Sequence, residues 1–323
     1  MGRYLSTGNP RLDELLGGGF LCGVTNTIYG DPGTGKTTLI MNTVLSNLDD
    51  DDKRKALIVD TESGWSVARI SRMAEAQGLD PQRALEHFQI YSVTELAAQH
   101  DTVMNKFEDD IKANRWKPIL FAVDSIAGIY HGQLLNTPTA NLAGRARELQ
   151  GRLSIQITKL LHLANTHETP AIVVTWIRSA AAESFEEKRQ NDTLRAFLAG
   201  ETGIDIEAGL GAWKYPLIGG QHLTYYSKVL IRLLSLESPE GDKLAILEKS
   251  IEQPSNRCLK YTIREGGINI PPDEQVRPLT DVIRELAEQN RAKQVEKRRR
   301  RGGAKQPEQE EETEAEETTP QQS

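Results

Sequence analysis

A glycine-rich loop, Gly30-Asp31-Pro32-Gly33-Thr34-Gly35-Lys36-Thr37-Thr38, constrains the fold of this chain more than any other segment. It matches the pattern G-x-x-x-x-G-K-[S/T], follows the apolar run 27–29 and precedes a helical pattern at 39–48. A strand that passes through glycines into a helix directs backbone N–H groups and the positive helix end at one point. The segment therefore predicts a phosphate-binding loop at the edge of an α/β sheet.

The residue types in this loop suit a nucleotide triphosphate and its metal ion. We expect the Lys36 amine to reach the β- and γ-phosphates of ATP, and the Thr37 hydroxyl to coordinate Mg²⁺. A glycine turn without a nucleotide is the alternative, and the strand and helix on either side argue against it. The candidate nucleotide-binding residues of the loop are Gly30, Asp31, Pro32, Gly33, Thr34, Gly35, Lys36, Thr37 and Thr38.

Two acidic residues at the ends of other predicted strands complete a hydrolysis site. The apolar run 119–123 ends in Asp124, which we expect to hold Mg²⁺ at the carboxyl edge of the sheet, with a strand-end cap as the alternative. The strand 56–60 leads to Glu62, which we place at the edge of the strand next to the phosphate loop. We expect Glu62 to orient or deprotonate the attacking water. The alternative is that Asp60 or Glu62 only caps the helix that follows.

Short apolar runs alternate with helical patterns along the first half of the chain. This alternation predicts a mostly parallel sheet with helices on both faces. The run 223–270 then changes to short β-like segments, which predict antiparallel strands that extend the sheet. Strands are predicted at 27–29, 56–60, 88–91, 119–124 and 170–176, and helices at 39–48, 67–77, 95–114 and 141–166.

The charge pattern divides the chain into three parts. We expect a core at 1–272, a charged helical extension at 273–301 and a disordered acidic tail at 302–323. Residues 291–301 hold seven basic residues against one acidic, and residues 304–323 hold one basic against seven acidic. These two charges cancel, so the body carries the net charge of −7 and is not a broadly basic nucleic-acid binder.

The chain lacks the marks of a membrane or secreted protein. No apolar run reaches the roughly 18 residues needed to cross a bilayer. The first residues have no signal-peptide pattern, and the two cysteines are far apart without metal-ligand spacing. We therefore expect a cytoplasmic location in a prokaryotic or viral setting.

At the level of whole segments the chain resembles the RecA/RadA-type recombinase ATPases. The run Leu5 to Phe20 looks like the entry to the core of that family, and it leads directly to the phosphate loop. Asp60-Thr61-Glu62 with the later Arg69 resembles its second strand, and Val123-Asp124-Ser125-Ile126 resembles its metal-binding strand. The resemblance implies a RecA-like ATPase core, Glu62 as catalytic base, and Arg69 packed on the nucleotide base.

The likeness covers about residues 4–270, with 217–222 and 247–250 resembling later strands of the family. Within the family the chain most resembles the archaeal RadB branch, which consists of the core alone. Such proteins lack the DNA-binding domain and the self-assembly segment that precede the core in RadA. The resemblance implies an accessory role in DNA repair and recombination, with single-stranded DNA and a main recombinase as partners and a homo-oligomer as a further possibility.

Two segments depart from the family pattern. The fifth core strand of the family ends in Asn-Gln, whereas here Thr175-Trp176-Ile177 has no amide, which predicts altered coupling between ATP and DNA. The loop 178–214, which would contact DNA by family position, holds five basic residues against seven acidic, although a loop that follows phosphates should be positive. The candidate DNA-contact residues are Arg145, Arg147, Arg152, Arg178, Lys188 and Arg189.

Three functions therefore stay open at the level of sequence. The first is a DNA-dependent ATPase or mediator of recombination, which the opening segment and the strand at 247–250 favour. The second is a KaiC-like assembly or signalling ATPase with protein clients, which the acidic body favours. The third is a divergent RecA-type recombinase of a virus. Stimulation of hydrolysis by single-stranded DNA discriminates among them.

Overall fold

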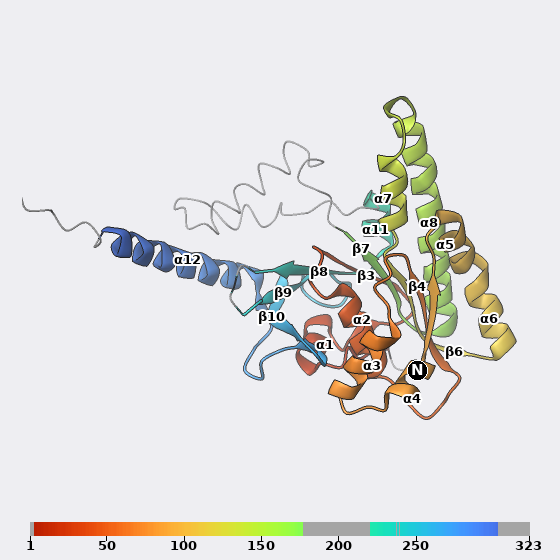
Figure 1. Cartoon of the computed structure of the whole chain (residues 1–323), viewed down its shortest axis with the longest axis horizontal. Helices are drawn as coiled ribbons and strands as arrows, with labels where there is room; N and C mark the ends of the chain where they lie inside the picture. Colours follow the sequence, from red (N-terminus) through yellow and green to blue (C-terminus); the bar gives the residue numbers. More distant parts are fainter. Residues whose placement is uncertain (1–2, 177–219, 237, 239, 303–323) are drawn as a thin grey trace, which may run out of the picture.

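The computed structural model describes residues 3–176, 220–236, 238 and 240–302, which fold around a ten-stranded sheet (Figure 1). The strand order is β11-β10-β9-β8-β3-β7-β6-β4-β5, and β12 pairs with β10. The strands of this sheet are Thr25–Gly30 (β3), Arg54–Asp60 (β4), Phe88–Ser92 (β5), Lys117–Asp124 (β6), Ala171–Thr175 (β7), Val229–Ser235 (β8), Lys243–Lys249 (β9), Arg257–Arg264 (β10), Gly267–Asn269 (β11) and Arg277–Pro278 (β12). A separate antiparallel pair joins Tyr4–Leu5 (β1) to Phe20–Leu21 (β2).

The sheet is parallel from β5 to β8 and antiparallel beyond. Strands β5, β4, β6, β7, β3 and β8 pair in parallel, whereas β9, β10, β11 and β12 pair antiparallel. All residues of β3 and β7 are buried, because helices cover both faces of these strands. The predicted fold class, a mostly parallel sheet with antiparallel C-terminal strands, is confirmed.

Helices cover the two faces of the sheet. One face packs against α1 (Pro10–Leu16), α2 (Lys36–Leu45), α3 (Val67–Ala76) and α4 (Pro81–Glu86). The other packs against α5 (Leu96–Asp101), a π-helical turn η1 (Thr102–Lys106), α6 (Phe107–Asn114), α7 (Gly128–Leu135), α8 (Leu142–His167) and α11 (Gly220–Tyr226), with a 3-10 turn η2 (Thr139–Asn141) before α8. The helix predicted at 95–114 is thus one helical stretch with a π turn inside it.

Two expectations about element order and type are wrong. Residues 224–226 are expected in a strand and 217–222 in another, but 220–226 form α11, and 217–219 lie outside the described residues. Leu223 of this helix is fully buried in the core cluster that also contains α8, so tertiary packing overrides the β propensity of Tyr225 and Tyr226. The strand β4, which leads to Glu62, is not next to β3, because β7 and β6 lie between them.

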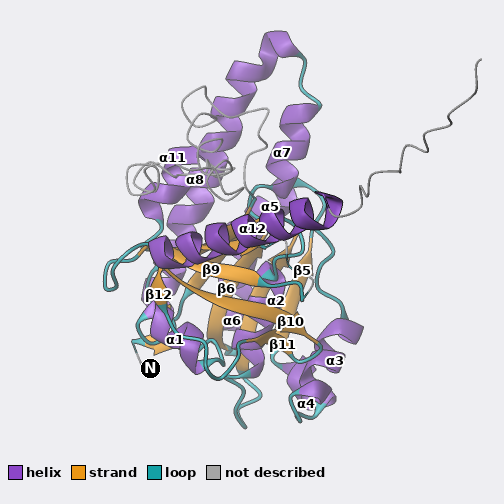
Figure 2. Cartoon of the chain, turned by 90° about the vertical axis from the view of Figure 1, so that its left-hand side faces the viewer, coloured by secondary structure: helices purple, strands orange, loops and turns teal. Residues whose placement is uncertain are grey.

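Three helices, α7, α8 and α12 (Leu279–Gly302), extend beyond the sheet. The hairpin of α7 and α8 rises above the carboxyl edge of the parallel strands (Figure 1). Helix α12 packs on β9 and β10 with its first turns, where Leu279, Val282, Ile283 and Ala287 join a third apolar cluster. The rest of the helix projects away from the sheet (Figures 1 and 2). Among the helices described, none combines the length and the apolar character that crossing a bilayer requires. The domain boundaries at 272 and 301 stay predictions.

Candidate nucleotide-binding site

The glycine-rich loop leaves β3 at Gly30 and enters α2 at Lys36. Gly30 has a φ of +150°, and a Cβ there would lie 2.0 Å from the carbonyl oxygen of Leu233 on β8. Gly35, the residue before α2, has a φ of +91°. Only glycine meets both demands without strain, so the loop packs tightly on the sheet. The roles of the loop residues in binding a nucleotide stay predictions.

Lys36 lies inside the loop that it terminates. Its side chain is 8% exposed, and the Nζ amine donates hydrogen bonds to the carbonyl oxygens of Gly30 (2.9 Å) and Asp31 (2.8 Å). Burial lowers the pKa of Lys36, while the carboxylates of Asp124, Glu62 and Asp31 oppose this shift. The loop thereby concentrates one positive charge at its centre, as an anion site requires.

Asp124, at the end of β6, lies directly beside the loop. Its carboxylate accepts hydrogen bonds from the Thr37 hydroxyl (2.6 Å) and from the Trp65 indole Nε1 (3.0 Å), both at the same oxygen. The side chain is 4% exposed, and burial raises the pKa of Asp124 to about 6, with the Thr37 bond opposing the rise. The structure therefore brings the two predicted metal ligands, Thr37 and Asp124, into contact. Sequence reasoning missed the indole donor.

Asp60 and Glu62 have separate tasks in the turn after β4. The Asp60 carboxylate accepts hydrogen bonds from the backbone N–H groups of Glu62 (3.1 Å), Gly64 (3.2 Å) and Trp65 (3.2 Å). Asp60 thus holds the turn, but it does not cap the helix that follows: Ser66 is the N-cap of α3 and accepts from the Arg69 N–H. The Glu62 side chain is exposed, and its Oε1 would lie 3.4 Å from a Cβ placed on Gly128.

Strand β6 connects the turn that carries Glu62 to the phosphate loop, because β4 pairs with β6 and is not next to β3. Strand β4 pairs with β6, with Asp60 opposite Asp124. The Thr61 N–H donates to the Asp124 carbonyl oxygen (3.0 Å), and the Thr61 hydroxyl donates to the Ser125 carbonyl oxygen (2.9 Å). Because Asp124 also contacts Thr37, the turn that carries Glu62 is tied to the phosphate loop across β6. The prediction that Glu62 follows a strand next to the phosphate loop is therefore corrected, since β7 and β6 lie between β3 and β4.

Arg69 on α3 joins the other side of the loop. Its guanidinium donates to the Thr38 hydroxyl (2.7 Å) and to the Gly64 carbonyl oxygen (3.0 Å). Burial lowers the pKa of Arg69, and the Asp124 carboxylate opposes this shift. The residue is therefore fixed at the site, and its contact with a nucleotide base stays a prediction.

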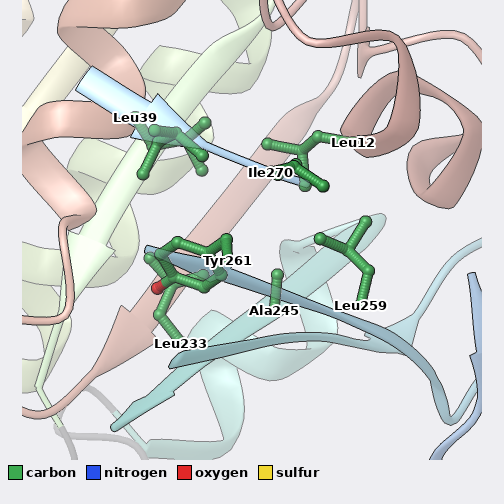
Figure 3. A pocket seen from close by; sticks show the side chains of 8 residues that line it. Leu12, Leu39, Leu233, Ala245, Leu259, Tyr261 and Ile270 are labelled. Atoms are coloured by element: carbon green, nitrogen blue, oxygen red, sulfur yellow. The ribbon is translucent and has the colours of Figure 1, made fainter. Parts of the chain in front are cut away.

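The antiparallel part of the sheet forms the back wall of the loop. The Tyr261 hydroxyl on β10 donates a hydrogen bond of 2.6 Å to the Thr34 carbonyl oxygen. A small cavity beside the Tyr261 ring is lined by aliphatic side chains from α1, α2 and β8 to β11 (Figure 3). No local pattern in the sequence points to this contact, because the two residues are 227 positions apart.

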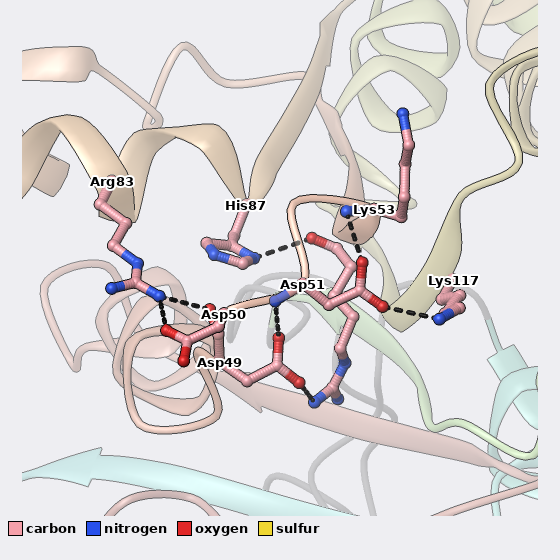
Figure 4. A network of polar contacts seen from close by, with 8 residues as sticks. Asp49, Asp50, Asp51, Lys53, Arg83, His87 and Lys117 are labelled. Carbon is pink, nitrogen blue, oxygen red and sulfur yellow. Dashed lines mark hydrogen bonds and ion pairs between the residues drawn. The ribbon is translucent and has the colours of Figure 1, made fainter.

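Three residues of the acidic run at 49–52, between α2 and β4, form a network of ion pairs (Figure 4). Asp49 pairs with Arg54 (2.7 Å), Asp51 with Lys117 (2.7 Å), and Asp50 with Arg83. The Lys117 hydrogen bond holds the pKa of Asp51 below its usual value. These carboxylates lie at the start of β4, the opposite end of the strand from Glu62. Within the described residues no cluster of three potential metal ligands occurs.

The candidate DNA-contact residues that the structure describes lie on the outer part of α8. Arg145 pairs with Glu148 (2.6 Å) and donates to Gln133 of α7 (2.9 Å), and Arg152 pairs with the same Glu148 (3.0 Å). Arg147 is exposed and forms no ion pair with a described residue. Arg178, Lys188 and Arg189 lie outside the described residues.

The sequence matches the Rad51 family over residues 3–195. It is 32% identical over 264 residues to the DNA repair and recombination protein RadB of Thermococcus gammatolerans, which covers 82% of this chain and 97% of that protein. RadB of Pyrococcus horikoshii is 34% identical over 267 residues, covering 83% and 94%. A crystal structure of the RadB recombinase has a TM-score of 0.60 and 27% identity, covering 83% of this chain and 99% of that one.

Proposed function

This chain belongs to the Rad51 family, and we propose that it binds ATP with Mg²⁺ at the phosphate loop and hydrolyses it in DNA repair and recombination. The matches support this interpretation over a KaiC-like or a divergent viral protein. The observation that carries the proposal is the contact between Thr37 and Asp124, with Lys36 buried beside it. These three residues are what a hydrolysis site needs around a bound phosphate.

The oxygen atoms at this contact fit Mg²⁺. The Thr37 hydroxyl and the Asp124 carboxylate are hard oxygen donors that lie 2.6 Å apart, on the two elements that flank the loop. Mg²⁺ typically takes one or two such protein ligands and completes its shell with water and phosphate oxygens. When bound, the ion would neutralise charge on the β- and γ-phosphates.

The protein residues supply the remaining steps. The Lys36 amine, now bonded to the carbonyl oxygens of Gly30 and Asp31, exchanges these partners for phosphate oxygens. Glu62 takes a proton from the attacking water, and the absence of a side chain at Gly128 leaves space beside its carboxylate. Arg69 contacts the nucleotide base.

In this proposal the protein binds DNA and acts together with a main recombinase. Arg145, Arg147 and Arg152 lie on the part of α8 that projects above the site edge (Figure 1). The phosphates of single-stranded DNA attract such basic side chains, which makes binding dependent on salt. We assign the chain an accessory role, with DNA-dependent hydrolysis of ATP and the option of a homo-oligomer.

Substitution of Lys36 by alanine tests the proposed hydrolysis of ATP. We expect the Lys36→Ala protein to lose ATP hydrolysis by about 10²-fold or more, because the charge that meets the phosphates is removed. Lys53→Ala is a matched control, since Lys53 is an exposed lysine at the turn before β4. Normal hydrolysis by the Lys36→Ala protein would refute the site.

Titration with single-stranded DNA tests whether the protein binds DNA and whether DNA stimulates ATP hydrolysis. We expect the wild-type protein to bind a single-stranded oligonucleotide at low salt and to hydrolyse ATP faster when it is bound. Fluorescence anisotropy and a phosphate-release assay measure the two effects. Absence of both in a protein that binds ATP would contradict the DNA part of the proposal and leave the nucleotide part standing.

A further inference from the structure

The phosphate loop is held from behind by a residue of the antiparallel extension. Tyr261 lies on β10, is 2% exposed, and donates its hydroxyl to the Thr34 carbonyl oxygen at 2.6 Å. Burial raises the pKa of Tyr261 well above its ordinary value, so the phenol keeps its proton and stays a donor throughout the working pH range. Thr34 is itself fully buried, within the loop that we assign to the phosphates.

The direction of this hydrogen bond fixes the direction of an N–H group. The Thr34–Gly35 peptide bond is trans, so the Thr34 carbonyl and the Gly35 N–H lie in one plane and point in opposite directions. When Tyr261 holds the carbonyl oxygen against β10, the Gly35 N–H points away from β10. Within the described part of the chain, this N–H has no hydrogen-bond partner.

We propose that Tyr261 is a positioning residue that locks the Thr34–Gly35 peptide in the orientation that presents the Gly35 N–H to the phosphates of the nucleotide. The inference rests on the proposed function, because it assigns a task at the same site. A peptide that rotated by half a turn would instead present a carbonyl oxygen to a polyanion, which repels it. Tyr261 acts through Gly35 and does not touch the nucleotide.

Such a lock is needed because the peptide joins a flexible residue. Gly35 has a φ of +91° and no side chain, so its backbone has more accessible conformations than that of any other residue type. Ile263 and Ile268 pack behind it, since their Cδ1 atoms would lie 2.8 Å and 3.4 Å from a Cβ at Gly35. These apolar contacts fix the position of the loop, whereas a hydrogen bond alone selects the direction of the peptide.

The side chains around the ring supply no donor in place of the hydroxyl. Apart from Tyr261 itself, the residues that line the small cavity beside the ring are aliphatic (Figure 3). A water molecule there would need two or more polar partners to stay. Without the hydroxyl, the buried Thr34 carbonyl therefore loses its partner and the peptide is released to rotate.

The same hairpin of β10 and β11 also supports the helix that carries Arg69. Gln77, which follows α3, donates its Nε2 to the Gly266 carbonyl oxygen (2.7 Å). Gly267 approaches Met73 of α3 so closely that a Cβ there would lie 2.5 Å from the methyl carbon. One antiparallel hairpin thereby contacts both the phosphate loop and α3, which makes Tyr261 part of a rigid support.

A Tyr261→Phe variant tests the lock, with Tyr91→Phe as the matched control. The Tyr91 hydroxyl donates to Asp110 at 2.6 Å on the far side of the sheet, so each variant keeps its ring and loses one hydrogen bond of similar length. Kd values for ATP and ADP are measured by fluorescent-nucleotide titration, and KM and kcat by phosphate release. We expect Tyr261→Phe to raise Kd and KM about tenfold, with kcat at saturating ATP within about twofold. We expect Tyr91→Phe to leave all three unchanged.

Separate results contradict the two proposals. Equal Kd values for the wild-type and Tyr261→Phe proteins, or equal shifts in both variants, would overturn the role of Tyr261. A wild-type protein that fails to bind ATP would instead refute the proposed function. The amide proton of Gly35 in the wild-type protein gives an independent readout. ADP should move its NMR resonance downfield, and an unmoved resonance would overturn the lock even if the variant did not fold.

Discussion

The phosphate-loop edge and the projecting hairpin of α7 and α8 differ in how far their charged side chains are buried and in how these are paired. At the loop edge Lys36 and Asp124 are 8% and 4% exposed, and each has fixed partners. On the hairpin the Arg145 and Arg152 side chains are 35% and 44% exposed and share one carboxylate, that of Glu148. Buried charges in fixed positions suit one small ligand, whereas exposed pairs are weak and exchange readily. This difference agrees with the proposed nucleotide site in the first region and with the proposed contact to an extended partner in the second.

The largest effect is expected from removal of the buried carboxylate. Asp124→Asn should lower kcat for ATP by about 10²- to 10³-fold, because the anionic metal ligand is lost. The amide still accepts from Thr37 and Trp65, and it removes a buried charge, so thermal unfolding should occur at an equal or higher temperature. Phosphate release and calorimetry check the two outcomes. A variant that keeps full activity would place the metal elsewhere.

The exposed carboxylate of the same edge should act on chemistry alone. Glu62→Gln should lower kcat by about 10²-fold, because the amide cannot accept a proton from water. The Kd for ATP should change by less than about twofold, since Glu62 does not contact the loop through a hydrogen bond. Glu75→Gln, an exposed residue of α3, is the control. Unchanged turnover in Glu62→Gln would show that another group activates the water.

The raised pKa of Asp124, about 6, gives the edge a dependence on pH. Below pH 6 protonation should weaken the apparent Mg²⁺ affinity by about tenfold per pH unit, which a metal titration at several pH values measures. The affinity for Mg²⁺ should thus rise with pH, whereas the stability of the metal-free protein should fall as pH rises. The folded state holds this proton up to about pH 6, whereas the unfolded state releases it near 3.8. The free energy of unfolding should therefore fall as pH rises between these values, by up to about 3 kcal/mol.

A wild-type stability curve that stays flat between pH 4 and 6 would contradict this linkage. Asp124→Asn is the matched control, because it lacks the titrating group and should not show the decrease. If the variant showed the same slope as the wild-type protein, the slope would belong to other carboxylates.

The smallest effects are expected on the hairpin. Arg147→Ala should weaken binding of single-stranded DNA by roughly threefold at low salt and reduce the salt dependence by less than one ion. Glu148→Gln should strengthen binding by a similar factor, because it releases Arg145 and Arg152 from their shared partner. Anisotropy titrations at several salt concentrations measure both. Opposite signs for the two variants sharpen the contrast with the loop edge, and no change in either would remove the hairpin from the DNA interface.

The sequence was most informative where a local pattern carries the chemistry. The glycine loop with Lys36 and Thr37, and the apolar run that ends in Asp124, are contiguous segments, so the strand, loop and helix follow from them directly. The fold class followed in the same way from alternating runs. The strand expected at 224–226 is wrong: these residues belong to α11, where Leu223 packs in the same core cluster as α8. A local pattern does not reveal this contact.

Contacts between distant segments were beyond such reasoning. The order β3-β7-β6-β4 decides that Glu62 reaches the loop across β6, and strand order is not written in any one strand. The indole N–H bond of Trp65 to Asp124 depends on the turn that Asp60 holds, which the sequence around Trp65 does not reveal. Tyr261 resembles any other buried aromatic residue of an alternating strand until β10 is placed behind the loop.

The hydrogen bond between Tyr261 and Thr34 also sets an order of events during synthesis. Its two residues are separated by 227 positions, so the ribosome releases the loop long before the strand that supports it. Chains emerge N-terminal end first, and contacts of such long range form late. A nascent chain that ends before β10 therefore carries the complete glycine motif without its support. Nucleotide binding in this protein should reach its full affinity only when nearly the whole core has been made.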